Sequence, residues 1–243
     1  MMSDNFFVKN IGRKIRYLLL GLLFILNFSS LSYCEIDFGR LLSIRDKGEL
    51  NKLAGEADTV LGKYPKDKNS LITLGIVYNN LATMEVKGAS AKAFGYLKQA
   101  NKLFPENPLL LAVLGSCITM LGRDADNIVD KMRYVNEGTP MIDKAVNTAP
   151  DNVSIRMIRS ENSAGLPKLF GRRKFVKEDL LHIEGIIRRA SKEVPVNLQA
   201  EVYYKLGNIF KSEEDLSQAN SYFKKAGELS PDSEWGKKAK REY

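Results

Sequence analysis

The feature that most constrains this chain is a set of regularly spaced prolines, each of which follows a stretch with apolar residues at helical spacing. The five are Pro65, Pro105, Pro150, Pro195 and Pro231. The intervals between them are 40, 45, 45 and 36 residues. Proline cannot continue a helix, so each one indicates that a helix has ended. The sequence therefore predicts a helical unit that recurs along the chain.

A second pattern fills the space between the prolines. Leu-Gly pairs at 74–75, 114–115 and 206–207 are each followed three residues later by a large apolar or aromatic residue. New helices are expected to begin about three residues after Pro65, Pro105 and Pro150. The last unit carries the fullest pattern, which consists of Tyr203, Leu206, Gly207, Phe210, Ala219, Phe223, Ala226 and Pro231.

This spacing resembles the 34-residue tetratricopeptide repeat (TPR). The resemblance implies an all-α fold, an α-solenoid of TPR-type helix pairs with inserted segments between the helices of the middle repeats. It places a degenerate first helical unit at 33–65 and the solenoid at 66–236, followed by a basic tail at 237–243. The predicted repeats are about 68–107, 108–152, 153–197 and 200–233. The third departs from the pattern, because Arg159 and Ser160 stand where Leu-Gly is expected.

The inserted segments follow from the intervals between the prolines. Against a period of 34, the first full repeat has about six extra residues and the next two about eleven each. They fall at 85–90, 123–138 and 166–178. In the second, apolar residues recur at near-helical spacing from Ile128 to Val135, so this insertion is expected to extend a helix. Pro108 and Pro140 are predicted to stand at helix starts.

The first 32 residues have the layout of a secretory signal peptide. A basic segment at 9–16 precedes a mostly apolar run at 17–28, and small or polar residues follow. This layout predicts export, with a mature chain beginning at Tyr33. Residues 31–34 also resemble a bacterial lipoprotein box, which makes Cys34 a candidate for lipidation, although Tyr33 departs from that motif. An uncleaved membrane anchor is the remaining alternative.

Composition and motifs argue against an enzyme. The chain has one histidine and two cysteines, and it contains no glycine-rich phosphate loop, HExxH, CxxC or GxSxG motif. No metal, cofactor or catalytic residue is predicted. The formal charge is +8, of which residues 1–32 contribute a surplus of three. The rest of the chain is only mildly basic, so nucleic acid is not an expected partner.

The TPR resemblance implies a concave groove lined by the first helix of each repeat. Counted from the Leu-Gly pairs, the groove positions are Ile72, Ile76, Asn79, Ala112, Ser116, Thr119, Met157, Glu161, Tyr204, Asn208 and Lys211. The family's carboxylate clamp, which grips a chaperone C-terminus, needs Lys and Asn where this chain has Ile72 and Ile76. The predicted groove is instead mixed and partly apolar, which suits a helix or an extended segment of another protein.

A second candidate surface is a basic loop in the third insertion. Arg172, Arg173, Lys174 and Lys177 surround two phenylalanines there. Such a loop would contact acidic protein, anionic lipid or nucleic acid. The alternative is that the aromatic rings pack inward while the charges stay in water.

The sequence therefore favours a non-enzymatic scaffold of a bacterial cell envelope, periplasmic or membrane-attached. Its expected partners are other proteins, with membrane contact through the N-terminus. The alternative function is an accessory subunit of an envelope transport system that handles a small ligand or lipid.

Overall fold

The computed structural model describes residues 37–243. The predicted signal segment, Tyr33 and Cys34 lie outside these residues. Every regular element from 37 to 243 is a helix, which confirms the predicted all-α fold. In chain order the elements are α2 (Phe38–Ser43), α3 (Lys47–Lys63), α4 (Lys68–Thr83), α5 (Ala89–Leu103), α6 (Pro108–Asp124), α7 (Ile128–Thr148), α8 (Val153–Gly165), η1 (Lys168–Phe170), α9 (Lys174–Ala190), η2 (Ser191–Glu193), α10 (Val196–Ser212), α11 (Leu216–Leu229) and α12 (Glu234–Ala239).

Most of the helices begin at a residue whose side chain satisfies a free backbone N–H of the first turn. Such caps favour helix starts because those N–H groups have no partner within the helix. The three helices predicted to follow prolines begin where expected, with α4 at Lys68, α6 at Pro108 and α8 at Val153. The capping residues are Asp46, Asp67, Asn107, Asn127, Asn152, Asp215 and Ser233.

The ends of three helices confirm the interpretation of the prolines. Tyr64, Phe104 and Ala149 cap the C-termini of α3, α5 and α7, and each directly precedes a proline. Each has left the helical region of backbone conformation, with ψ between 64° and 82°. A residue before proline is driven out of that region by the proline ring. Each of these helices therefore ends because of the proline that follows its C-cap residue.

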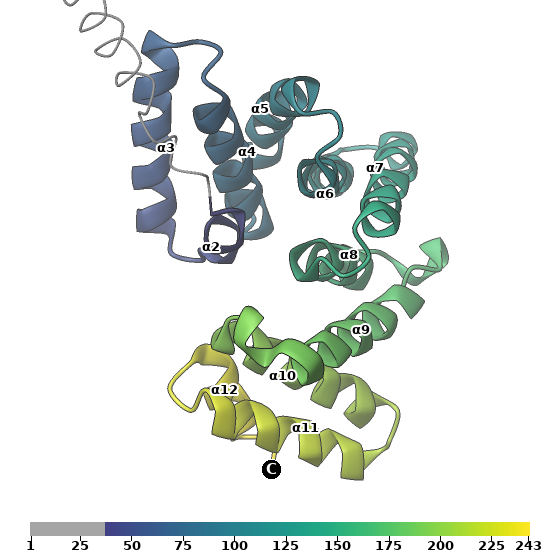
Figure 1. Ribbon diagram of the computed structural model, residues 1–243. Helices are drawn as coiled ribbons and strands as arrows, with labels where there is room; N and C mark the ends of the chain where they lie inside the picture. Colours follow the sequence, from purple (N-terminus) through teal and green to yellow (C-terminus); the bar gives the residue numbers. More distant parts are fainter. Residues whose placement is uncertain (1–36) are drawn as a thin grey trace, which may run out of the picture. The chain divides into compact units, whose positions relative to one another are not determined.

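The helices pack in successive pairs (Figure 1). Within α4–α5, α6–α7, α8–α9 and α10–α11 each helix lies against its partner, and α4 also contacts α6, as α6 contacts α8. The first helices of the first three pairs thus lie side by side, as expected for an α-solenoid. The helices α8 and α10 pack less closely, and α9 contacts both of them.

Glycine sets the closeness of the α6–α7 contact. A Cβ atom added at Gly115 would lie 2.7 Å from the backbone oxygen of Gly138, and one added at Gly138 would lie 2.4 Å from the backbone oxygen of Gly115. Only two facing glycines allow the helix backbones to meet in this way. Gly207 likewise leaves room for the ring of Phe223 from α11, which would lie 2.5 Å from an added Cβ.

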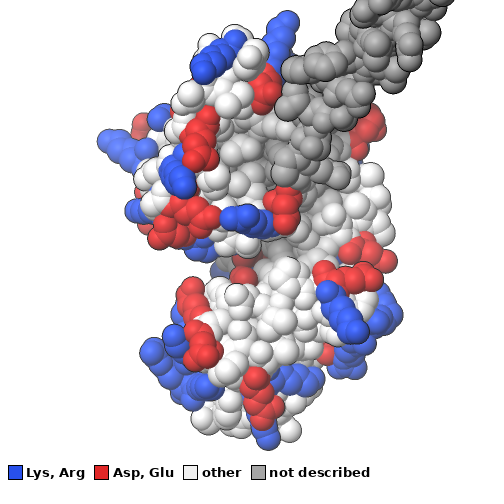
Figure 2. All heavy atoms as spheres, turned by 60° about the vertical axis from the view of Figure 1, so that its left-hand side comes forward, with Lys and Arg blue, Asp and Glu red and all other residues white. Residues whose placement is uncertain are grey.

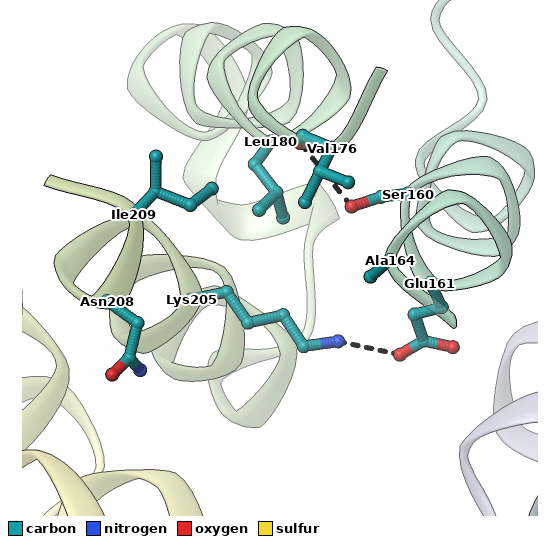
Figure 3. A pocket seen from close by; sticks show the side chains of 8 residues that line it. All are labelled: Ser160, Glu161, Ala164, Val176, Leu180, Lys205, Asn208 and Ile209. Atoms are coloured by element: carbon teal, nitrogen blue, oxygen red, sulfur yellow. Dashed lines mark hydrogen bonds and ion pairs between the residues drawn. The ribbon is translucent and has the colours of Figure 1, made fainter. Parts of the chain in front are cut away.

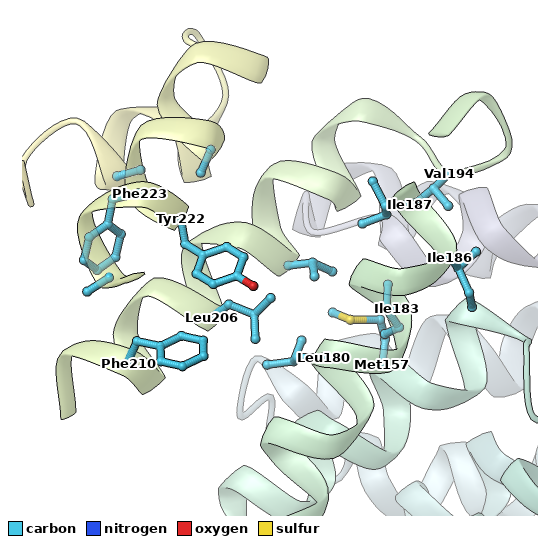
Figure 4. Packing of buried hydrophobic residues seen from close by; sticks show 14 residues of the cluster. Met157, Leu180, Ile183, Ile186, Ile187, Val194, Leu206, Phe210, Tyr222 and Phe223 are labelled. Carbon is cyan, nitrogen blue, oxygen red and sulfur yellow. The ribbon is translucent and has the colours of Figure 1, made fainter. Parts of the chain in front are cut away.

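The apolar core continues from pair to pair. One cluster of buried residues joins α8 through α12 (Figure 4), and Leu180, Leu206 and Phe223 are among its least exposed members. The same cluster takes in Ala239 of α12, so neighbouring units complete each other's core.

The prediction that Pro140 starts a helix is wrong. Pro140 does not start a helix but lies inside α7, exposed, while its neighbours Thr139 and Ile142 are buried. Packing against α6 thus outweighs the hydrogen bond that the proline removes. The second insertion does extend a helix, as predicted, since α7 begins at Ile128.

The predicted basic tail also differs from the structure. Its first residues belong to α12, which packs against α10 and α11. Gly236 makes this possible, because an added Cβ would lie 1.9 Å from the backbone oxygen of Ser230.

Candidate functional site

The predicted groove residues divide into a buried and an accessible group. On α4 and α6, the side chains of Ile72, Ile76, Asn79, Ala112 and Thr119 are buried and that of Ser116 is half-buried. Met157 of α8 is buried as well. The accessible members lie on α8 and α10, where Tyr204 is half-buried and Glu161, Asn208 and Lys211 are exposed.

Two members of the accessible group, Glu161 and Asn208, line a pocket of about 300 Å³ between α8, α9 and α10 (Figure 3). Most of its surface is apolar, since Val176 and Leu180 of α9 and Ile209 of α10 contribute to its wall. Glu161 and Asn208, both predicted from the sequence as groove residues, lie at its rim. The residues that line it are Ser160, Glu161, Ala164, Val176, Leu180, Lys205, Asn208 and Ile209.

The pocket arises where the repeat pattern fails. In the other three pairs a glycine at this position lets the second helix approach, whereas Ser160 occupies it in α8. Its hydroxyl donates a 3.4 Å hydrogen bond to the backbone oxygen of Val176, one turn from Leu180. A side chain thus stands between α8 and α9 where the other pairs have a bare glycine, and these two helices pack less extensively than the other pairs do.

One lysine at the pocket joins two carboxylates. The Nζ atom of Lys205 lies 2.7 Å from an oxygen of Glu161 on α8 and 2.7 Å from an oxygen of Glu201 on α10. Arg45, from the turn between α2 and α3, also acts electrostatically on both carboxylates. The Glu161 carboxylate also reaches solvent, since 40% of its side chain is exposed.

Desolvation and charge act differently on the three groups. Desolvation lowers the pKa of Lys205, but the two carboxylates outweigh it and raise that pKa overall. Desolvation raises the pKa of Glu161, but Lys205 reverses the effect and lowers it. At Glu201 desolvation prevails and the pKa is raised. Lys205 therefore stays charged, and Glu161 is the more readily ionised acid.

An aromatic surface adjoins the pocket on the side of α12. The ring of Tyr204 lies 5.6 Å from that of Trp235 and 5.8 Å from that of Phe223, measured between centroids. The Nζ atom of Lys238 lies 4.6 Å from the centroid of Trp235. Trp235 lies outside the repeat pattern, and nothing in the sequence connected it with the groove.

Polar groups continue from the pocket toward α6 and α4. Asn162 of α8 donates a hydrogen bond to the Oγ1 atom of Thr119, a predicted groove residue on α6. The side-chain oxygens of Asn79, Asn162 and Ser163 are buried and have no hydrogen-bond partner among the described residues. Buried acceptors of this kind are costly unless a donor reaches them.

Comparison with solved structures identifies this architecture. A match with probability 1.00 and a TM-score of 0.60 is the crystal structure of TTC0263, a thermophilic TPR protein in Thermus thermophilus. The aligned region covers 80% of this chain and 91% of that one, with 16% sequence identity. The fold is a TPR-type α-solenoid. No family model matches the sequence, and no curated protein matches it. Arrays of this fold are typical protein-interaction scaffolds.

The predicted basic loop is not a single free loop in this TPR solenoid. Lys174 and Lys177 belong to α9, and Lys177 lies 2.5 Å from a carboxylate oxygen of Glu213. Arg172 forms a bidentate pair with Asp143 of α7, at 2.6 and 2.7 Å. Only Arg173 and Lys174 are exposed, so the free charge of this surface is about half of what the sequence indicated.

The phenylalanine in this segment packs inward, as the alternative interpretation expected. The centroid of the Phe175 ring lies 4.4 Å from the guanidinium of Arg159 and 4.3 Å from that of Arg172. Both of these cations also bind carboxylates, so the ring is in contact with paired charges. The segment is fixed to α7 and α8.

A buried charge cluster lies between α8 and α9, and no local sequence pattern indicates it. Asp179, whose side chain is fully buried, accepts bidentate hydrogen bonds from Arg159 at 2.7 Å and another from Arg156 at 2.8 Å. Burial lowers the pKa of Arg159, but the hydrogen bonds and charge of Asp179 outweigh it and raise that pKa. The arginine at the expected leucine position therefore takes part in packing.

The described residues form neither a metal site nor a membrane-spanning helix. Among residues 37–243 no cluster of His, Cys, Asp and Glu has the arrangement of a metal site. None of the helices described there is both long and apolar enough to cross a membrane. His182 contacts Asp151 at 2.6 Å on the surface, and Cys117 is buried.

Proposed function

We propose that this protein is a non-enzymatic scaffold that binds a segment of another protein along the first helices of its TPR pairs. The observation that carries this proposal is the pocket between α8 and α10, because it is accessible and mainly apolar, and because Glu161 and Asn208 in its lining are positions expected to face the groove. Concave sites with an apolar wall and a few polar groups are the usual places for binding. The TPR fold supports the same role for the chain as a whole.

Site-specific crosslinking tests the proposal directly. A photoreactive p-benzoylphenylalanine at position 208, which is exposed at the pocket rim, should capture a protein partner in the native cells. The matched control carries the same group at position 221, which is exposed on α11. Adducts formed at 208 and absent at 221 are the expected result.

A blocking variant makes the crosslinking test stricter. Ala164 is exposed at the pocket, so Ala164→Trp places an indole ring in it and should abolish the adducts at 208. Equal capture at 208 and 221, or capture that the tryptophan leaves unchanged, would show that the groove is not the binding surface.

The second candidate function is the handling of a small ligand, as in a transport accessory subunit. It is favoured by the pocket volume of about 300 Å³, the lower end of the usual range for small-molecule sites. Native mass spectrometry of protein purified from its own cells distinguishes the two. A bound small molecule that Ala164→Trp displaces, without any crosslinked protein, would favour this function.

The place of action belongs to the proposal as well. The signal-peptide layout of residues 1–32 supports export to the cell envelope, with a cleaved, lipidated or retained N-terminus. Intact-mass measurement on the native protein identifies which form exists. Recovery of the chain from the cytosol with Met1 still present would refute export.

A further inference from the structure

We infer that the pocket between α8, α9 and α10 selects a partner segment in which a large aliphatic or aromatic residue stands next to a lysine or arginine. This inference rests on the proposed function, which it makes specific for one subsite. It depends on three features of the described residues, namely the apolar wall, the excess of acid at the rim and the distribution of neighbouring charges.

The wall of the pocket determines the apolar part of the preference. Val176, Leu180 and Ile209 present methyl groups to the pocket, and Ala164 leaves its mouth unobstructed (Figure 3). The volume of about 300 Å³ is roughly twice that of an apolar cavity that holds benzene. One leucine, methionine or phenylalanine side chain fits this space, and its burial removes apolar surface from water.

The rim determines the charged part of the preference. Within residues 37–243, Glu161 and Glu201 share one directly bound cation, that of Lys205, which leaves one negative charge in excess among these three groups. The Glu161 carboxylate remains accessible, with 40% of its side chain exposed. A cation brought to this rim gains a partner, whereas a carboxylate brought there meets two like charges.

Arg45 lies near enough to the rim to act on it electrostatically. The charge of its guanidinium favours the ionised form of both carboxylates, although the pKa of Glu201 stays raised overall by desolvation, and the structure records no direct ion pair between Arg45 and either acid. Its own Nη1 atom donates to the backbone oxygen of Leu42 at 2.6 Å. Arg45 therefore neutralises the rim from a distance, and a partner cation at contact distance interacts with the same carboxylates more strongly.

The charged side chains of one face of the molecule are mixed in sign. In the face shown in Figure 2, acidic and basic side chains alternate over both parts of the solenoid. Two cations of the third insertion, Arg172 and Lys177, are already paired with carboxylates. Specificity at the pocket thus depends on a local arrangement of charges, and long-range attraction contributes little to it.

Selection from a library of random heptapeptides displayed on phage tests this inference with the full chain as bait. The expected result is enrichment of peptides with Leu, Ile, Met or Phe within two residues of Lys or Arg. Ala164→Trp should remove the apolar preference, and Glu161→Gln should remove the basic one. Lys224→Ala, an exposed position on α11, is the matched control and should leave the selection unchanged.

Affinity measurements on one enriched peptide quantify the effect. In fluorescence polarisation, Ala164→Trp should weaken binding at least about 10-fold, and Glu161→Gln about 5-fold, the upper range for an accessible charge pair. Replacing the peptide cation by glutamine should cost the same about 5-fold in the unmodified protein and nothing in Glu161→Gln. Arg45→Ala should tighten binding of the cationic peptide, because it unmasks the rim.

The outcomes separate this inference from the proposed function. The inference would be wrong, and groove binding would remain supported, if the peptides whose binding is lost in Ala164→Trp carry acidic residues or lack a large apolar residue. The inference would also be wrong if the losses in affinity caused by Glu161→Gln and by replacing the peptide cation with glutamine simply add when the two changes are combined. If no enriched peptide responds to any pocket variant, the proposed function itself fails. Unfolding curves identify any variant that fails to fold, and for Ala164→Trp the milder Ala164→Leu then replaces it.

Discussion

The facing glycines of α6 and α7 allow a sharp test of how the TPR solenoid is held together. Gly115→Ala adds one methyl group to the contact between these helices. Its carbon would lie 2.7 Å from the backbone oxygen of Gly138 and 2.9 Å from Cγ1 of Ile142. A side chain can rotate away from such a contact, but a helix backbone oxygen cannot. The two helices must therefore separate where they now touch.

The size of the effect follows from two opposing terms. Overpacking a well-packed core costs about 1–3 kcal/mol, and contact with backbone favours the upper half of this range. Replacing glycine by alanine within a helix recovers about 0.5–1 kcal/mol of helix propensity. The net loss in the free energy of unfolding is then about 1–2 kcal/mol, which lowers the melting temperature of a chain of this size by about 2–8 °C.

Gly95 is the matched control for this change. It lies within α5, and a Cβ added there would meet nothing within 4 Å. Gly95→Ala should therefore show the propensity term alone and raise the melting temperature by about 1–4 °C. Calorimetry measures both variants, and hydrogen exchange should localise the loss in Gly115→Ala to α6 and α7. A Gly115→Ala protein as stable as the Gly95→Ala one would refute the close contact.

Three further predictions concern buried and paired groups. Asp179→Asn leaves Arg156 and Arg159 without their shared carboxylate and should cost about 3–5 kcal/mol in urea unfolding, whereas Glu228→Gln on the surface should cost nothing measurable. Burial raises the pKa of Cys117 to about 12, so its alkylation should stay slow in the native protein at pH 9 and become fast on unfolding. Because the thiol of the unfolded chain ionises at a lower pH than that of the folded protein, Cys117 should lower the free energy of unfolding as the pH rises above 9. Arg172→Ser should lower the melting temperature, while Arg173→Ser with Lys174→Ser should leave it unchanged.

The helix boundaries were predictable because they depend on local chemistry. Helix caps are local, because the side-chain oxygens of Asp67, Asn107 and Asn152 accept hydrogen bonds from backbone N–H groups no more than three residues further along the chain. The prolines are local as well, because each restricts the backbone of the residue directly before it. Pro140 shows the limit of this reasoning. Its local effect is the same as elsewhere, but the burial of its neighbours against α6 decides the outcome.

The buried charges were not predictable, because they join residues that no local pattern connects. Arg159 and Asp179 are 20 positions apart, and Arg172 and Asp143 are 29 apart. Charged residues in a helix are normally assigned to a solvated face, since charges are rarely buried without a partner. The same limit applies to Trp235, which reaches Tyr204 only because α12 folds back on α10.

The departure of the third repeat from the TPR pattern connects these observations. Arg159 in place of leucine would leave a charge in the core, but Asp179 supplies its partner from α9. Ser160 in place of glycine puts a side chain between α8 and α9, and this serine is one of the residues that line the pocket. A sequence that breaks its own repeat rule at two adjacent positions loses stability unless something compensates, and such sites are where function is expected. Here the charge cluster stabilises a pair of helices that no longer pack tightly, and the open space between them forms the proposed binding site.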